Sequence, residues 1–185
     1  MPKLNYHLPR LILKANGVTY GKGLRLHGVP FVFRFPNAKI ELGSDVSINS
    51  NFLSNLLGLY QRTIIVAKGK GQIKIGNRVG ISGATIYSWD RIEIGDDTRI
   101  GANVKIVDTD FHPIDPAERL KGNNDAAKTR PIKIGKNVFI GMNSLILKGT
   151  VLGDNCVVGG GTVVSGKFED NCVIAGNPAR VIRKI

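Results

Sequence analysis

Several features that mark other classes of protein are scarce in this sequence of 185 residues. Its two cysteines, Cys156 and Cys172, lack CxxC spacing and a nearby histidine. This argues against a disulfide framework and favours buried thiols in a reducing compartment such as the cytoplasm. No apolar run reaches the ~20 residues of a membrane-spanning helix, and the N-terminus lacks the continuous apolar core of a signal peptide. These absences predict a soluble globular protein.

Acidic residues are missing from the first forty positions, which nevertheless hold seven basic ones. These are Lys3, Arg10, Lys14, Lys22, Arg25, Arg34 and Lys39. The charge is compatible with a solvated face, nucleic acid, an anionic membrane or a phosphorylated substrate. Because no nucleic-acid motif accompanies it, no nucleic-acid partner is expected. Peripheral contact of residues 1–40 with an anionic membrane is kept as a hypothesis.

What the sequence does have is a six-residue repeat of aliphatic positions. The unbroken run comprises Ile134, Ile140, Ile146, Leu152, Val158 and Val164. The same register is expected earlier at Ile94, Ile100 and Ile106, at Ile75, Ile81 and Tyr87, and more weakly at Leu42 and Ile48. Between Tyr87 and Ile94 the spacing is seven, which predicts one inserted residue.

Six residues are three periods of a β-strand, so every repeating residue points to the same side of its strand. Three such units close a triangular coil of eighteen residues, and turn stretches such as "GDDT", "GKN" and "GDN" suit its corners. The sequence therefore predicts an all-β chain, a parallel β-helix over residues 21–185. An ordinary β-sandwich would show irregular turns instead of an unbroken register.

Two segments leave the register. Residues 1–20 predict a short helix that caps the first coil. Its expected apolar face comprises Leu8, Leu11, Ile12 and Ala15. Residues 108–131 are polar and aperiodic, and we expect a long excursion there, of the kind that is often functional. Residues 52–72 are also irregular and receive no assignment.

Three stretches carry a resemblance to a known family. They are "IGDDTRIGANVKIVDTDFHPID" (94–115), "PIKIGKNVFIGMNSLILKGTVLGDNCVVGGGTVVSG" (131–166) and "AGNPARVIRKI", the C-terminal tail 175–185. With "IGNRVGISGATI" (75–86), they are similar to the hexapeptide-repeat acyltransferases with a left-handed β-helix. The chain looks most like the branch of maltose, galactoside and polysaccharide O-acetyltransferases. The resemblance implies a homotrimer with active sites between neighbouring prisms, acetyl-CoA as co-substrate, and a sugar or polysaccharide precursor as acceptor. The basic residues 1–40 add the hypothesis that this acceptor is a lipid-linked saccharide at the membrane or carries phosphate.

His112 is the expected general base of such a transfer. Taking a proton from a hydroxyl suits histidine, because an ordinary imidazole is partly neutral near pH 7. If residues 108–112 are extended, Asp108 and Asp110 lie on the same side as His112, and either could orient the ring or cap backbone groups instead. We assign the orienting role to Asp110.

The resemblance also implies a set of residues that contact the co-substrate. A backbone N–H near Gly141 and Met142 matches the family's donor to the developing oxyanion. Phe139 stands where the family often has Trp, and Met142 where related enzymes have a small residue. Small residues along the pantetheine and basic residues near the 3′-phosphate match Gly160, Ser165, Gly166, Arg180 and Arg183. For Arg183 a solvated basic tail is an equal alternative.

Ser82 and Asp90 match acceptor-facing positions of related enzymes, although Asp90 could instead form a turn. Trp89 could stack on a sugar ring or cover the core. An amine acceptor, as in an amino-sugar N-acetyltransferase, stays open, and so does a non-catalytic β-helix that binds a partner. A γ-class carbonic anhydrase is disfavoured, because its zinc needs three histidines and His7, His27 and His112 are far apart in sequence. No metal is expected.

Overall fold

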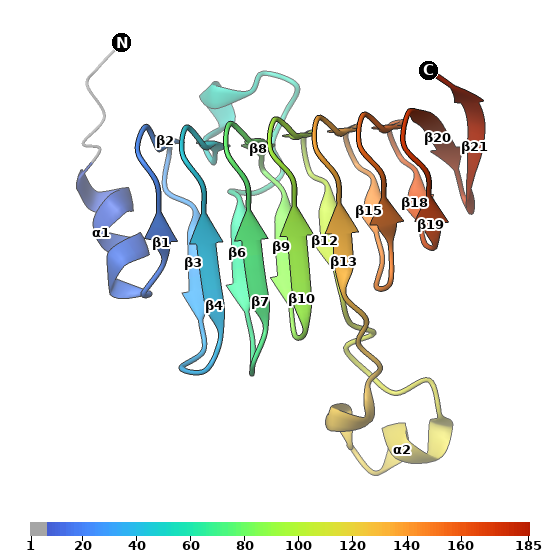
Figure 1. Cartoon of the computed structure of the whole chain (residues 1–185). Helices are drawn as coiled ribbons and strands as arrows, with labels where there is room; N and C mark the ends of the chain where they lie inside the picture. The colour runs from blue at the N-terminus through green and yellow to red at the C-terminus, as the bar shows by residue number, and fades with distance from the viewer. Residues whose placement is uncertain (1–6) are drawn as a thin grey trace.

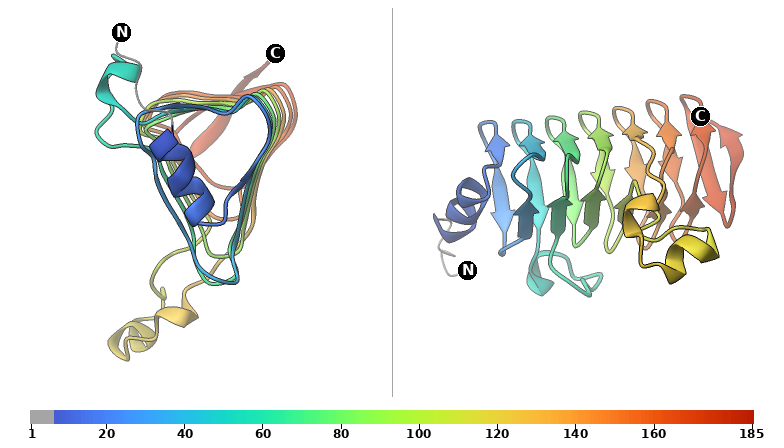
Figure 2. Two further views of the ribbon diagram at one scale, coloured as in Figure 1. Left: turned by 90° about the vertical axis from the view of Figure 1, so that its left-hand side faces the viewer. Right: turned by 90° about the horizontal axis from the view of Figure 1, so that it is seen from below.

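The repeating aliphatic residues stack into the core of a triangular prism. A computed structural model of the chain, which describes residues 7–185, shows three parallel sheets around that core (Figure 1). Each of the first six coils contributes one strand to every sheet, and the coils wind in the left-handed sense along the axis (Figure 2). The predicted left-handed parallel β-helix is confirmed.

We call the three sheets A, B and C in the order in which the chain enters them. Sheet A contains β1 (Thr19–Tyr20), β4 (Lys39–Leu42), β7 (Gln72–Ile75), β10 (Arg91–Ile94), β13 (Ile132–Ile134), β16 (Val151–Leu152) and β19 (Lys167–Phe168). Sheet B contains β2 (Arg25–His27), β5 (Ser47–Asn49), β8 (Gly80–Ser82), β11 (Arg99–Ile100), β14 (Phe139–Ile140), β17 (Val157–Val158), β20 (Cys172–Gly176) and β21 (Ala179–Lys184). Sheet C contains β3 (Phe31–Arg34), β6 (Ile64–Ala67), β9 (Thr85–Ser88), β12 (Lys105–Val107), β15 (Leu145–Ile146) and β18 (Val163–Val164).

The stacking of equivalent residues follows the predicted register over most of the chain. Ile140 lies beside Val158, eighteen residues on, and both are fully buried. The last coil is two residues shorter, because Val158 pairs with Ile174.

One expected position of the repeat is wrong. Ile86, not Tyr87, is the inward residue of β9: it is fully buried and pairs with Ile106. Tyr87 points outward and contacts the ring of Phe111 edge-on at 5.1 Å between centroids. Gly83, which has a φ of 54°, forms a corner one residue shorter than usual, and the extra residues follow Ile86.

The corners between sheets A and B use left-handed backbone conformations, as their turn residues predict. Asn137, Asn155 and Asn171 have φ values of 52°, 59° and 59°, which Asn tolerates better than most residues. Their side chains form a ladder, with Nδ2 of Asn137 and of Asn155 each donating to the next Oδ1 at 3.0 Å. The ladder ties three successive coils together.

Helix α1 (His7–Ala15) covers the first coil, as expected, but with a different face. Leu13 is fully buried, whereas Leu8 and Leu11 are 54% and 63% exposed. Residues 1–6 of the predicted capping segment lie outside the described residues. No helix of residues 7–185 is long and apolar enough to cross a membrane.

Two excursions leave the prism from different edges (Figure 2). Residues 50–63, which include the short helix η1 (Phe52–Ser54), project where sheet B passes into sheet C, the BC edge. Residues 108–131 project where sheet C passes into sheet A, the CA edge, with the bounds that the sequence predicts. They contain α2 (Pro116–Leu120) and η2 (Asn124–Ala126). At the far end β20 and β21 form an antiparallel hairpin.

Candidate active site

The two ends of the excursion at the CA edge, residues 108–110 and 128–130, pair with each other, and we call this paired segment the neck. Asp110 N donates to Lys128 O at 3.1 Å, and Arg130 N donates to Asp108 O at 3.0 Å. Thr109 and Thr129 form a β-bridge between these bonds. The neck fixes where the excursion begins and ends relative to the coils.

Asp108 is fully buried at the base of the neck and ties it to the preceding coil. Its carboxylate accepts hydrogen bonds from Ser88 Oγ (2.6 Å), Trp89 N (2.8 Å) and Asp90 N (3.0 Å). Burial raises the pKa of the Asp108 carboxyl, although these three donors act in the opposite direction. Asp108 therefore caps a turn, which is one of the two roles that the sequence leaves open.

His112 is exposed on the excursion, and one of its two ring nitrogens lies within hydrogen-bonding distance of another side chain. Nδ1 is 2.8 Å from Oδ1 of Asn124, the first residue of η2. When Nδ1 carries the proton and donates to this oxygen, Nε2 keeps a lone pair that can accept a proton. Nε2 has no hydrogen-bond partner within residues 7–185. This is the arrangement that a general base needs.

Asp110 contacts a cation rather than the ring of His112. Its Oδ1 forms an ion pair with Lys148 Nζ, and its Oδ2 is buried without a partner among the described residues. Between Asp110 and His112, Phe111 has a φ of 62°, a conformation that is strained for a bulky residue. The turn at Phe111 separates the two side chains that the sequence places on one side.

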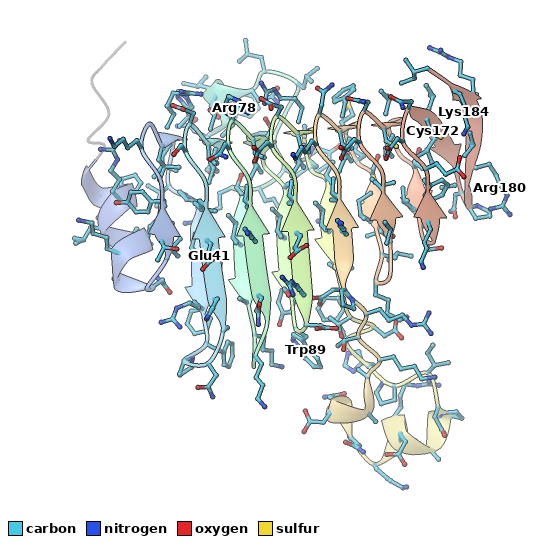
Figure 3. All side chains as sticks on the ribbon, viewed as in Figure 1. Glu41, Arg78, Trp89, Cys172, Arg180 and Lys184 are labelled. Atoms are coloured by element: carbon cyan, nitrogen blue, oxygen red, sulfur yellow. The ribbon has the colours of Figure 1, made fainter. Side chains whose placement is uncertain are left out.

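Trp89 and Asp90 lie at the same edge as the excursion (Figure 3 labels Trp89). Lys68 Nζ is 4.2 Å from the centroid of the Trp89 ring, a cation–π contact. Trp89 also borders a cavity of about 240 Å³ that Asp125 of the excursion helps to line. The backbone of Asp90 is held by Asp108, and its side chain is half-buried.

The predicted pantetheine and oxyanion residues Gly141, Met142 and Gly160 lie at the BC edge instead. The N–H of Gly141 already donates to Val158 O at 2.8 Å, so it is not available to an oxyanion. The N–H of Met142 has no acceptor within residues 7–185 and is the better candidate. A Cβ on Gly141 would lie 2.5 Å from Gly160 N, so close packing of coils by itself requires glycine at position 141.

The remaining predicted co-substrate residues are spread over two further places. Ser165 and Gly166 form the corner between β18 and β19 at the CA edge, and Gly166 has a φ of 107°. Arg180 and Arg183 are exposed on the C-terminal hairpin (Figure 3 labels Arg180). The Nη1 of Arg180 donates to Ala179 O at 2.9 Å.

Ser82 lines a groove of about 590 Å³ on the outer face of sheet B. Asn49 Nδ2 donates to Ser82 Oγ at 3.0 Å. Arg25, Arg99 and Phe139 also line this groove. The groove is thus polar and basic toward the N-terminal coils and aromatic at Phe139.

Most of the predicted residues therefore fall into two groups, apart from Ser165, Gly166 and the arginines of the C-terminal hairpin. His112, Asp110, Trp89 and Asp90 gather at the CA edge, while Ser82, Gly141, Met142 and Gly160 lie at the BC edge, across sheet C. Sequence reasoning missed Asn124, since nothing in an aperiodic stretch signals a partner twelve residues from His112. Among the side chains that the structure describes, no three His, Cys, Asp or Glu residues come together to hold a metal ion.

Comparison with known proteins identifies relatives of this chain. Residues 131–165 match the family model "Hexapeptide repeat of succinyl-transferase". A protein of Escherichia coli K12 named "Putative lipopolysaccharide biosynthesis O-acetyl transferase WbbJ" is 31% identical over 159 residues, 83% of this chain and 78% of that protein. Galactoside O-acetyltransferase of the same organism is 40% identical over 101 residues, 55% of this chain and 48% of that protein.

Solved structures are similar over the whole chain. A galactoside acetyltransferase in complex with coenzyme A is 28% identical, with a TM-score of 0.55 over 100% of this chain and 72% of that chain. The chain thus spans most of the first relative but only about half of the galactoside enzyme of Escherichia coli.

Proposed function

This chain belongs to the hexapeptide-repeat acyltransferase family, and we propose that it transfers an acetyl group from acetyl-CoA to a hydroxyl of a sugar or polysaccharide precursor. The observation that carries the proposal is His112 on the excursion, with Nδ1 held by Asn124 and Nε2 free of partners within residues 7–185. The names of the relatives support a hydroxyl acceptor.

Acetyl-CoA, when bound, supplies the acetyl group as a thioester. His112 Nε2 takes the proton of the acceptor hydroxyl while the acceptor oxygen attacks the acetyl carbon and the C–S bond breaks. The imidazolium then returns the proton to the departing sulfur. Such general base catalysis contributes about 10²- to 10⁴-fold.

The BC edge fits the narrow pantetheine arm of the co-substrate. Gly160 is exposed, and a Cβ on it would lie 3.3 Å from Met142 O and 3.7 Å from Met142 Cγ, so the absence of a side chain leaves the backbone accessible at this edge. Met142 N offers a donor for the developing charge on the acetyl oxygen. Arg180 and Arg183 remain the proposed partners of the 3′-phosphate, for which the guanidinium is well suited.

A complete site needs two protomers. In one protomer, sheet C separates His112 at the CA edge from Met142 and Gly160 at the BC edge. Packing prisms side by side in a homotrimer would bring the CA edge of each against the BC edge of its neighbour. Mixing His112→Ala with Gly160→Trp protomers tests this: separately inactive proteins should regain part of the activity when mixed, and a site within one protomer would give none.

The acceptor is proposed to be a sugar or a lipid-linked saccharide, with residues 1–40 in peripheral contact with the inner face of an anionic membrane. Thiol release from acetyl-CoA should be measured against a panel of sugars and amino sugars, with His112→Ala as control. Turnover with a hydroxyl sugar that the variant loses is expected. Acetylation of an amine alone would instead make the chain an N-acetyltransferase, and the absence of both turnover and acetyl-CoA binding by calorimetry would refute an enzymatic role.

A further inference from the structure

Two arginine side chains reach toward each other in the groove on the outer face of sheet B. Arg25 comes from β2 of the first coil and Arg99 from β11 of the fourth. Arg25 Nη2 donates to Asp45 O on the second coil at 3.2 Å, and Arg99 Nη1 donates to Arg78 O on the third coil. The two guanidinium groups therefore lie over adjacent coils, which are spaced about 4.8 Å apart.

Small residues form the floor of the groove between the two arginines. Ser47 and Gly80 lie between Arg25 and Arg99 in one column of register-paired residues. A Cβ on Gly80 would lie 3.2 Å from Cδ of Arg99, so glycine at this position lets the arginine side chain lie close to the sheet. The small floor residues leave room for a ligand between the guanidinium groups in this groove of about 590 Å³.

Neither guanidinium group is neutralised by a carboxylate in the part of the chain that the structure describes. Arg25 and Arg99 take part in none of its ion pairs, and Asp45 meets Arg25 only through its carbonyl oxygen. Asp97, the acid that lines the groove, accepts two hydrogen bonds of 2.7 Å from Arg78 instead (Figure 3 labels Arg78). Two positive charges in a concave surface attract an anion.

The groove ends beside the proposed site of acetyl transfer. Gly101 lines the groove, and a Cβ on Gly101 would lie 2.8 Å from Met142 N, the proposed donor to the developing oxyanion. Met142 is on the fifth coil, so the guanidinium groups over the second and third coils are about 10–14 Å from it along the axis. A sugar ring whose hydroxyl lies near Met142 can bridge this distance with a phosphate group at the arginines.

We propose that the groove binds a phosphate group of the acetyl acceptor, which is then a sugar phosphate, either free or joined through its phosphate to a further group. The inference rests on the proposed function, because it names the class of acceptor for the same reaction. A carboxylate has two oxygens, which one arginine can engage in a bidentate pair. A phosphate group offers enough oxygens for both guanidinium groups at once, and arginine suits its geometry.

The position of the arginines is compatible with the proposed trimer. Both arginines begin their strands, at the AB edge where sheet A passes into sheet B. The neighbour's CA edge would pack at the opposite, BC edge, and its His112 would reach the end of the groove near Gly101. The neighbour's excursion offers few acids to the arginines, because Asp115 caps its own helix and Glu118 accepts from two side chains of the same excursion.

Isothermal titration calorimetry with CoA already bound tests the proposal, because CoA then occupies its own phosphate sites. The ligands are glucose 1-phosphate, galactose 1-phosphate, the two corresponding uridine diphosphate sugars, the free sugars, and glucuronic acid as a carboxylate. The uridine diphosphate sugars distinguish a phosphate that carries a further group from a free one. The test variant is Arg25→Gln/Arg99→Gln, and the matched control is Lys14→Gln/Lys39→Gln, which removes two exposed charges of α1 and β4 outside the groove. Circular dichroism melting and light scattering check the fold and the oligomer mass of each protein.

We expect at least one phosphorylated sugar to bind at least about tenfold more tightly than the free sugar. The test variant should lose this difference, whereas the control keeps it. In thiol release, the test variant should raise the KM of the phosphorylated sugar and leave the KM of acetyl-CoA unchanged.

Four results would overturn the proposal. The first two are equal affinities for phosphorylated and free sugars, and an affinity for glucuronic acid as high as for the phosphorylated sugars. The third is a test variant that raises the KM of acetyl-CoA, since the arginines would then bind the co-substrate. The fourth is a test variant that loses the oligomer mass of the intact protein, since the arginines would then pair with the neighbouring protomer.

Comparing binding with turnover distinguishes a failure of this inference from a failure of the proposed function. A protein that binds a phosphorylated sugar through the arginines but releases no thiol with any acceptor contradicts the proposed activity, while the phosphate site is supported. Thiol release with free sugars, without any preference for phosphorylated ones, contradicts this inference alone.

Discussion

Replacing Asn124 should weaken catalysis without abolishing it. Asn124 holds Nδ1 of His112 at 2.8 Å through a neutral hydrogen bond between exposed groups. Such a bond is worth about 0.5–1.5 kcal/mol, which corresponds to about two- to tenfold in rate. Asn124→Ala should therefore lower kcat/KM by about two- to tenfold, compared with about 10²- to 10⁴-fold for His112→Ala.

Asn124→Asp separates a positioning role from a purely structural one. A carboxylate at this position favours the imidazolium, so the acid limb of the kcat/KM profile should move to higher pH. An exposed ion pair contributes about 0.2–1 kcal/mol, which predicts a shift of a few tenths to about 0.7 of a pH unit. Asn124→Ala adds no charge and should not move the limb upward.

The assay is thiol release from acetyl-CoA between about pH 5 and 9, a range that spans the ordinary titration of histidine. Asn123→Ala is the matched control, because the Asn123 side chain donates to Glu118 Oε2 at 2.7 Å rather than to His112. An Asn124→Asp profile that coincides with that of the intact protein would refute the positioning role. A loss in Asn124→Ala as large as that in His112→Ala would show that Asn124 itself meets the reacting groups.

Three further predictions concern the scaffold. Ile86→Ala should lower the free energy of unfolding by about 2–5 kcal/mol, and Tyr87→Ala by clearly less; urea unfolding checks this, and the reverse order would contradict the register. Gly141→Ala should lower the free energy of unfolding by about 1–3 kcal/mol, because the added Cβ would lie 2.5 Å from Gly160 N. Gly160→Ala should lower the free energy of unfolding by less. Urea unfolding of both variants checks this, and equal losses would contradict the packing argument. Burial raises the pKa of the Asp108 carboxyl in the folded protein. The neutral carboxyl therefore contributes stability that is fully present below about pH 3.9, the ordinary pKa of Asp in the unfolded chain. That contribution is lost as the pH rises through the higher pKa of the folded protein. The stability of the intact protein relative to Asp108→Asn should therefore fall with pH in urea titrations from about pH 4 upward, and a difference that rises with pH would contradict the assignment.

The fold was predictable because its determinant is local and repeated. A residue such as Ile140 is inward for the same reason as Val158 and Ile146, so each repeat confirms the others. The prediction that Tyr87 points inward was wrong for a physical reason. The corner at Gly83 is shorter than usual and the one after Ile86 is longer, so the two changes in residue number nearly cancel over a whole coil. A count of residues alone cannot distinguish that pair of changes from a single insertion.

The site was predictable only for residues whose type by itself indicates a chemical role. His112 stands out as the histidine of an aperiodic excursion, but its partner depends on how that excursion folds back on itself. The positive φ of Phe111 turns His112 away from the extended geometry that would place it beside Asp110, and Lys148, on the next coil, neutralises Asp110 instead. Spacing in sequence determines contacts only while the backbone keeps one regular conformation. The contacts of an excursion are determined by its neck and its turns, so the partner of the base is fixed by tertiary structure and has to be tested at Asn124.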